Sequence, residues 1–161
     1  MRRTFRMNLN DTDLKNTIRY VKEYKKWVLE KEEELRNRLA ELGASVASIQ
    51  FAGATYDGTN DVSVRVDSTG SVAVIYAEGK AVAFIEFGSG AKYGYGHTHA
   101  DELGMGPGTY PEGKGYWDNP NGWYYAHGKK SYGNPPAMAM VKAIERMTEE
   151  LTTIAREVFG H

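Results

Sequence analysis

Cysteine is absent from this chain of 161 residues. Its absence excludes a disulfide scaffold, a thiolate nucleophile and every zinc site built on thiolates. Long hydrophobic runs are also lacking, because no apolar stretch approaches the roughly 18 residues that a membrane span needs. The basic start, residues 1–6, is followed by no apolar segment, so the sequence predicts no signal peptide.

An excess of charge of one sign is lacking too. The chain carries 20 basic and 21 acidic residues, a formal net charge of −1. This balance gives no global bias toward nucleic acid or an anionic membrane. The 11 basic and 8 acidic side chains of residues 1–42 are interleaved, which is typical of a solvated helix face. With 41% hydrophobic residues, the length predicts a single globular domain, residues 1–161.

Apolar residues recur at helical spacing after several N-cap candidates at positions 10–13, and Gly43 is a natural end for the helix. The stripe consists of Leu14, Ile18, Val21, Val28, Leu35, Leu39 and Leu42. A helix of about 30 residues would be ~45 Å long, whereas a globule of this chain length is about 40 Å across. We therefore expect the helix to span or overshoot its own domain and another subunit to cover part of its stripe.

A second amphipathic helix is predicted near the C-terminus. Asn134-Pro135-Pro136 introduces it, and Gly160 ends it. Its apolar stripe consists of Ala137, Val141, Ile144, Met147, Leu151, Ile154 and Val158.

The residues between the helices predict strands. Four strand-like runs, 47–51, 62–67, 71–77 and 81–87, are separated by short turn signals. Short links favour antiparallel pairing, and residues 123–126 offer a further strand that could return to the sheet. We therefore predict an α+β fold in which a meander of three to five strands packs under the two helices. The expected core includes Val64, Val74, Phe84, Ile144 and Leu151.

Residues 88–134 form a long insert that is rich in glycine and aromatic residues. Twelve of the 18 glycines and seven of the 11 tyrosines lie between positions 88 and 133. Loops of this length inside a domain are usually functional or ordered by a partner, and Tyr, Trp and Gly together are typical of protein contacts. The candidate contact residues are Tyr95, Trp117, Trp123 and Tyr125. A module that stacks sugars or nucleic-acid bases on these rings remains an alternative.

Candidates for chemistry are few. His97 and His99 have a metal-like spacing, with His127 as a third ligand and Asp101 or Glu102 nearby, and a metal-dependent hydrolase is the alternative that they support. Glu86 lies in an apolar run, where we expect its carboxylate to pair with a basic or backbone donor. No Gly-x-Ser-x-Gly elbow or Walker-type loop is present. The sequence therefore assigns no catalytic residue, no metal and no cofactor, and predicts that the protein is not an enzyme.

Three local patterns together resemble a known family. A segment ending in Phe84-Ile85-Glu86-Phe87-Gly88-Ser89-Gly90 is followed by a loop ending in Gly122-Trp123-Tyr124-Tyr125, and Gly133-Asn134-Pro135-Pro136-Ala137-Met138-Ala139-Met140 then opens the last helix. This order, after an N-terminal helix, resembles the small tail-component (tail-completion) proteins of long-tailed bacteriophages. The insert here is long and aromatic, and Met138 and Met140 stand where that family frequently has an aromatic residue.

The resemblance implies a structural role without catalysis. Proteins of that family join head to tail at the neck and assemble as rings, so it implies a homo-oligomer, expected to be a hexamer. The implied partners are the adjoining neck, connector and tail proteins, and DNA would pass through the lumen without specific binding. The implied location is the virion, assembled in the cytoplasm of the bacterial host, with no membrane contact.

Overall fold

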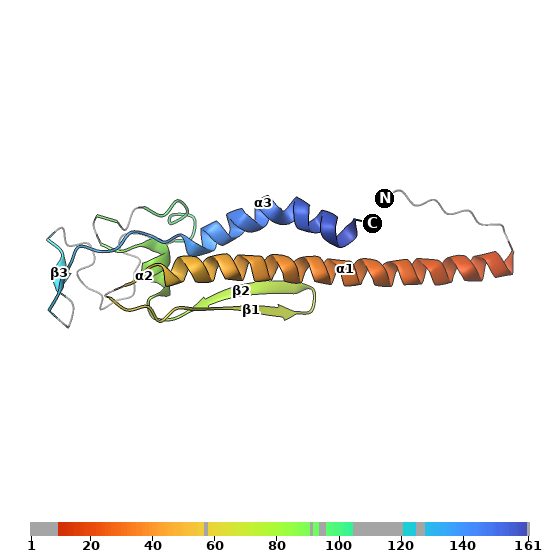
Figure 1. Cartoon of the computed structure of the whole chain (residues 1–161), viewed down its shortest axis with the longest axis horizontal. Helices are drawn as coiled ribbons and strands as arrows, with labels where there is room; N and C mark the ends of the chain where they lie inside the picture. Colours follow the sequence, from red (N-terminus) through yellow and green to blue (C-terminus); the bar gives the residue numbers. More distant parts are fainter. Residues whose placement is uncertain are drawn as a thin grey trace.

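The computed structural model describes residues 10–56, 58–90, 92–93, 96–104, 121–124 and 128–160 (Figure 1). The elements in chain order are α1 (Asp11–Ala52), β1 (Ser63–Thr69), β2 (Val72–Glu78), α2 (Val82–Phe87), β3 (Trp123–Tyr124), β4 (Lys130–Ser131) and α3 (Ala139–Phe159). The long helix α1 forms the axis of the molecule, with α3 along one side and the β1–β2 hairpin along the other (Figure 1). This arrangement confirms the α+β class and both predicted helices.

The N-terminal helix is longer than the sequence predicted. Asn10 is its N-cap and accepts a hydrogen bond from the backbone N–H of Asp13 (2.9 Å). The helix has 42 residues, which corresponds to about 63 Å. It continues through Gly43, and the strand predicted for residues 47–51 is wrong, because Ala47 and Phe51 are buried on one face of the helix.

Gly43 is retained inside the helix because two other elements approach it. A Cβ atom at this position would lie 2.6 Å from Cδ1 of Ile75 in β2 and 2.6 Å from Sδ of Met147 in α3. These distances are far below normal carbon contacts. Gly43 therefore marks the place where the hairpin and α3 approach α1 most closely, and it does not end the helix.

The strands form two separate pairs in place of one meander. β1 pairs with β2 antiparallel, with Ser63 opposite Glu78 and Thr69 opposite Val72. β3 pairs with β4 and lies apart from this hairpin. The alternation predicted for residues 62–67 is confirmed, since Val62, Val64 and Val66 are half-buried while the residues between them are exposed.

The fourth predicted strand, residues 81–87, is instead the short helix α2. Phe84, Ile85 and Glu86 are all buried, and a short run that is buried on every side does not show whether it is a strand or a helix. Just before α2, the carboxylate of Asp61 accepts hydrogen bonds from the backbone N–H groups of Lys80 (2.8 Å) and Ala81 (3.0 Å). These two bonds fix the turn that leads from β2 into the helix.

The core is built mainly from small residues. Ala40, Gly43 and Ala47 of α1 are buried, as are Ala139 and Ala143 of α3. Their small size lets the two helices approach closely.

This packing overturns part of the predicted core. Phe84 is buried and Val64 is half-buried, but Val74, Ile144 and Leu151 are exposed by 39%, 59% and 44%. Because the alanine face of α3 turns toward α1, the larger side chains Ile144 and Leu151 point away from it.

Two segments far apart in the sequence, 84–90 and 133–140, pack directly against each other. Ser89 and Asn134 form an antiparallel bridge with N···O distances of 2.9 and 3.2 Å, and the Ser89 hydroxyl also donates to the side-chain oxygen of Asn134. Gly133 has a φ of 103°, and a Cβ there would lie 1.9 Å from the carbonyl oxygen of Ser89. Only glycine permits this approach.

The carboxylate of Glu86 caps the N-terminus of α3. Met138, in the left-handed conformation (φ 51°), supplies no side-chain cap. Instead, the backbone N–H of Ala139 donates to Oε2 of Glu86 (2.7 Å), and that of Met140 lies 3.2 and 3.1 Å from the two carboxylate oxygens. The buried negative charge thereby satisfies N–H groups that have no partner within the helix and faces the positive end of the helix dipole. The predicted backbone pairing of Glu86 is confirmed, although a helix and not a strand carries it.

We predict that Glu86→Gln destabilises the fold by about 1–3 kcal/mol, because a neutral amide replaces a charged acceptor of buried N–H groups. Chemical denaturation at neutral pH measures the free energy of unfolding. The control is Glu149→Gln on the exposed side of α3, which should change it by less than about 0.5 kcal/mol. Equal effects of the two substitutions would contradict the capping role.

A pH dependence follows from Asp61. The hydrogen bond from Lys80 N–H, followed by that from Ala81 N–H, holds the pKa of the Asp61 carboxyl below its usual value. Such a group stabilises the fold at pH values above its unfolded pKa of about 3.9, and this contribution is lost as the pH falls through the depressed folded pKa. Asp61→Asn should therefore be less stable than the wild type at pH 7, and thermal unfolding should show this difference narrowing below about pH 4. A difference that stays constant down to pH 2 would argue against this role.

Candidate protein interface

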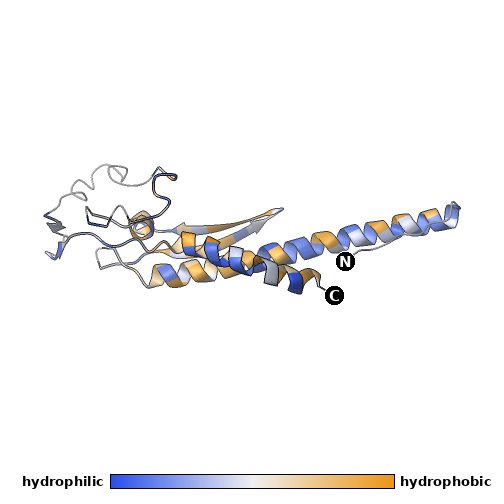
Figure 2. Cartoon of the chain, turned by 90° about the horizontal axis from the view of Figure 1, so that it is seen from above, coloured by the Kyte–Doolittle hydropathy of each residue, from blue (hydrophilic) through white to orange (hydrophobic). Residues whose placement is uncertain are grey.

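The N-terminal part of α1 extends beyond the rest of the fold (Figure 1). The rings of Trp27 in α1 and Phe159 in α3 meet edge to face, with centroids 6.0 Å apart, and α3 ends there. We call residues 11–26 the arm, and it is about 24 Å long. Leu14, Ile18 and Val21 of the arm are exposed by 47%, 46% and 47%, and in Figure 2 hydrophobic and hydrophilic residues alternate along it. The predicted overshoot of the helix is confirmed, and its stripe is exposed on the arm.

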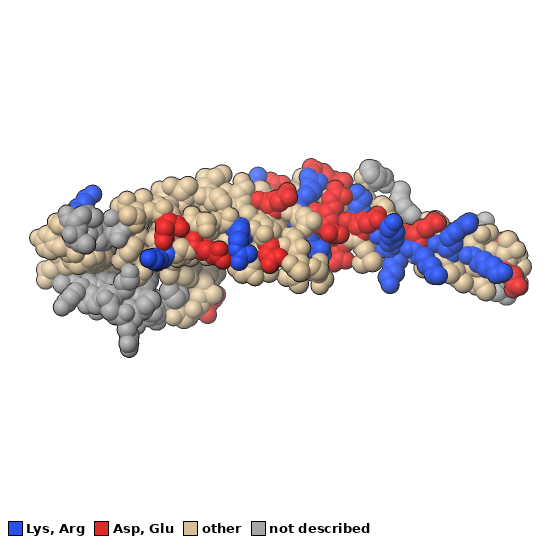
Figure 3. Space-filling model, turned by 90° about the horizontal axis from the view of Figure 1, so that it is seen from below, with Lys and Arg blue, Asp and Glu red and all other residues tan. Residues whose placement is uncertain are grey.

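The arm is also basic. It carries five basic side chains (Lys15, Arg19, Lys22, Lys25 and Lys26) against three acidic ones (Asp11, Asp13 and Glu23). Lysine and arginine dominate the face of the arm that Figure 3 shows, whereas acidic side chains gather over the middle of the molecule. The arm thus combines an exposed apolar stripe with flanking positive charge.

An apolar groove lies between α2, β2 and the beginning of α3. It has a volume of about 650 Å³ and is lined mostly by Ala77, Val82, Phe87, Leu103, Met140 and Ile144. Leu103 and Ile144 are exposed by 61% and 59%. The charged residues that line it are Glu86, Glu102 and Glu145, and the described lining includes no lysine or arginine. The sequence does not predict this groove, because the helical pattern places Ile144 in the core and Leu103 belongs to no predicted element.

A second groove, of about 680 Å³, has the opposite chemistry. Its lining includes Lys92, Tyr93, Lys129, Lys130 and Tyr132. The Lys92 ammonium lies 5.0 Å from the ring centroid of Tyr93, and that of Lys130 lies 5.0 Å from the ring centroid of Tyr132. We call it the lysine–tyrosine groove. The fold brings Lys92 to the adjacent pair Lys129 and Lys130, from which it is distant in the sequence.

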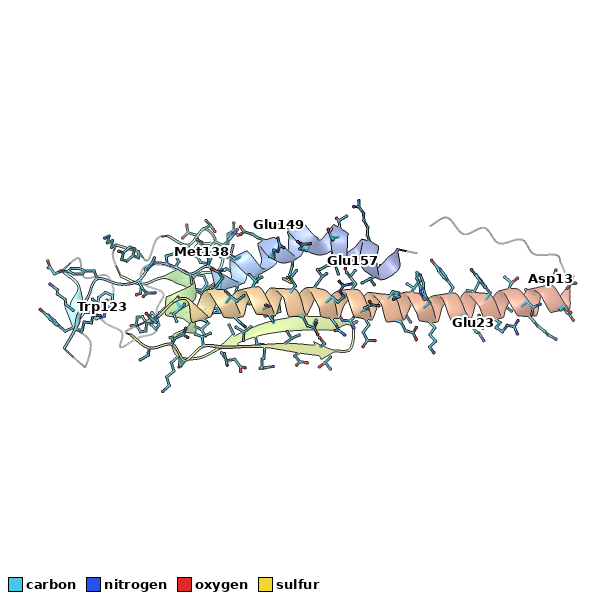
Figure 4. All side chains as sticks on the ribbon, in the orientation of Figure 1. Asp13, Glu23, Trp123, Met138, Glu149 and Glu157 are labelled. Carbon is cyan, nitrogen blue, oxygen red and sulfur yellow. The ribbon has the colours of Figure 1, made fainter. Side chains whose placement is uncertain are left out.

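Of the four predicted contact residues, the structure describes Trp123 alone. Tyr95, Trp117 and Tyr125 lie outside the described residues. Trp123 is half-buried in β3, at the end of the molecule opposite to Asp13 (Figure 4). Its neighbour Tyr124, which the sequence analysis did not select, is exposed by 70%.

The histidine candidates do not form a metal-binding cluster among the described residues. His97 and His99 lie in a turn, not on a strand. Nδ1 of His97 accepts a hydrogen bond from the backbone N–H of His99 (3.1 Å), and this leaves Nε2 as the protonated nitrogen, 3.5 Å from Oε1 of Glu86. Nδ1 of His99 lies 3.1 Å from the carboxylate of Glu102, and His127 lies outside the described residues.

A wider search for ligands gives the same result. In the part of the chain that the structure describes, no group of three or more His, Cys, Asp or Glu side chains could hold a metal ion. Of the carboxylates considered, Glu86 caps α3, and its oxygens are occupied by backbone N–H groups. The described residues therefore offer apolar and charged surfaces for binding.

No described helix has both the length and the apolar character to cross a membrane. Comparisons of the chain with models of known protein families, with curated proteins and with solved structures return no match.

Proposed function

We propose that this chain is a non-enzymatic structural protein of a phage virion, which assembles as a ring at the neck or tail and completes the joining of head to tail. The proposal rests on the sequence resemblance to tail-completion proteins. Its mechanism is assembly, in which surfaces that are exposed on the single chain become buried between subunits and against adjoining neck or tail proteins.

The observation that carries the proposal is the arm of α1. It holds three large apolar side chains, Leu14, Ile18 and Val21, each nearly half exposed, on a helix that no other described element covers. Contiguous exposed apolar surface of this kind marks protein–protein contacts. A catalytic site requires no such projection, whereas a subunit that reaches its neighbour does.

The packing of two of the three patterns that carry the resemblance gives further support. The segment 84–90 and the segment 133–140 form one junction through the Ser89–Asn134 bridge and the Glu86 cap. Both motifs therefore serve the same structural purpose, which is to place α3 against α1. Two sequence patterns that share one structural role support the resemblance more strongly than two short matches with no structural relation.

We expect the purified protein to form discrete rings as its concentration is raised, and the double variant Trp117→Ala/Trp123→Ala to assemble poorly while its circular dichroism stays that of the folded wild type. Large aromatic residues commonly dominate the energy of an interface, so their loss should cost several kcal/mol, about 2–4 for each hot-spot residue. Light scattering coupled to gel filtration measures the mass, and negative-stain imaging shows the particle. Full assembly of the double variant would exclude Trp117 and Trp123 as interface residues, and a wild type that is monomeric throughout would contradict ring formation.

A second candidate role, contact with the phosphate backbone of nucleic acid, is favoured by the lysine–tyrosine groove. Lys92, Lys129 and Lys130 gather around it with two tyrosines, whereas the acidic Glu102 lines the other groove. Among the described residues of the insert, these three lysines therefore lie at one groove and Glu102 at the other. Lysines that track phosphates and rings that stack on bases are the two components of sequence-independent binding.

The triple variant Lys92→Ala/Lys129→Ala/Lys130→Ala tests this role. If the groove binds single-stranded DNA, the slope of log K against log salt should become shallower by about 0.7 for each phosphate that the variant no longer neutralises. The matched control removes the same charge from the arm, as Lys15→Ala/Lys22→Ala/Lys26→Ala. Binding that responds equally to both variants would show non-specific attraction to charge, and the groove would then have no role in DNA binding.

A further inference from the structure

We propose that the arm of one copy docks into the apolar groove of a second copy. This inference deepens the proposed function, on which it rests, because it names the contact that joins subunits. The occupant of the groove is then residues 11–26 of a neighbouring chain, with Leu14, Ile18 and Val21 as the inserted side chains.

The apolar chemistry of the two surfaces matches. Leu14, Ile18 and Val21 have the spacing i, i+4, i+7, so they lie on one face of the helix within about 10 Å along its axis. The groove presents Leu103 and Ile144, which are more than half exposed, between two helices and a strand. An amphipathic helix that lays three such anchors into an apolar groove is a recurrent mode of recognition.

Complementary charge makes this contact more specific than the burial of apolar side chains alone. The arm carries two more basic than acidic side chains, five against three. The exposed carboxylates of the groove are Glu102 and Glu145, and none of its described lining residues is a lysine or arginine. Opposite potentials on the two surfaces steer the encounter and fix the orientation of the docked helix. The lysine–tyrosine groove, by contrast, would repel the arm.

The two surfaces cannot meet within one chain. Val21 of the arm and Ala47, beside the groove, are joined by an unbroken helix and lie about 40 Å apart along it. Arm and groove thus lie toward opposite ends of the molecule (Figure 1). A contact between two different surfaces is heterologous, and its repetition gives a ring where the rotation between subunits closes and an open filament where it does not. The ring of the proposed function is the closed case of this contact.

Two variants test the contact from its two sides. The arm variant is Leu14→Glu/Ile18→Glu, and the groove variant is Leu103→Glu/Ile144→Glu. All four side chains are exposed in the single chain, so circular dichroism and the thermal midpoint should remain those of the wild type. Each variant should raise the concentration needed for half-assembly by at least about a hundredfold, because unpaired carboxylates would be buried in the contact.

Matched controls introduce glutamate at positions outside the apolar stripe of the arm and outside the groove. Asn16→Glu adds one negative charge to a different face of the arm, and Val72→Glu replaces an exposed apolar residue of the hairpin outside the groove. Both control variants should assemble at wild-type concentrations. Loss of assembly in the controls equal to that in the test variants would overturn the assignment of these two surfaces.

Mixing the two defective variants provides the decisive measurement. The groove variant keeps a functional arm and the arm variant keeps a functional groove, so an equimolar mixture should form dimers and stop there, as light scattering would show. A mixture that stays monomeric overturns the inference. If the wild type and the arm variant both form rings, the docking inference is wrong and the proposed function still holds. If the wild type never assembles, both the docking inference and the proposed function are wrong.

Discussion

The fold depends on one buried carboxylate, that of Glu86. It accepts hydrogen bonds from the first N–H groups of α3, which have no acceptor of their own within that helix. Since an unsatisfied buried donor costs about 1–3 kcal/mol, the start of α3 is tied to α2. The helix α2 is in turn held to the end of the hairpin through Asp61. The hairpin, α2 and α3 are therefore connected to one another by hydrogen bonds from backbone N–H groups to the carboxylates of Asp61 and Glu86.

Small residues decide which surfaces remain exposed. Ala139 and Ala143 of α3 share one buried cluster with Ala47 of α1, and Met147 of α3 lies against Gly43, so the two helices approach closely. Ile144 lies one residue from Ala143, which is about 100° around the helix, so this packing turns it outward. The apolar groove is therefore a consequence of the core, because the alanines that bury one face of α3 leave its larger side chains at the surface.

The sequence alone correctly predicted those features that depend on residues close together in the chain. The start of α1 at Asn10 and the end of α3 before Gly160 could be predicted because capping depends on neighbouring residues. The strand predicted for residues 81–87 was wrong because a short run that is apolar except for Glu86 suits either structure. Gly43 was misread because its reason lies in Ile75 and Met147, which are distant in sequence. Both grooves were missed for the same reason, since their linings come from segments that only the fold brings together.

A continuous helix also explains how the arm persists without a partner. An isolated helix as short as the arm is marginal in water, because nucleation is costly. Here the arm extends a helix that the core has already nucleated, so each added turn needs only propagation. The same continuity makes α1 a rigid spacer between the groove, which is built on its C-terminal half, and the apolar stripe at its N-terminal end. In a head-to-tail assembly the separation of neighbouring subunits would then be set by the length of α1.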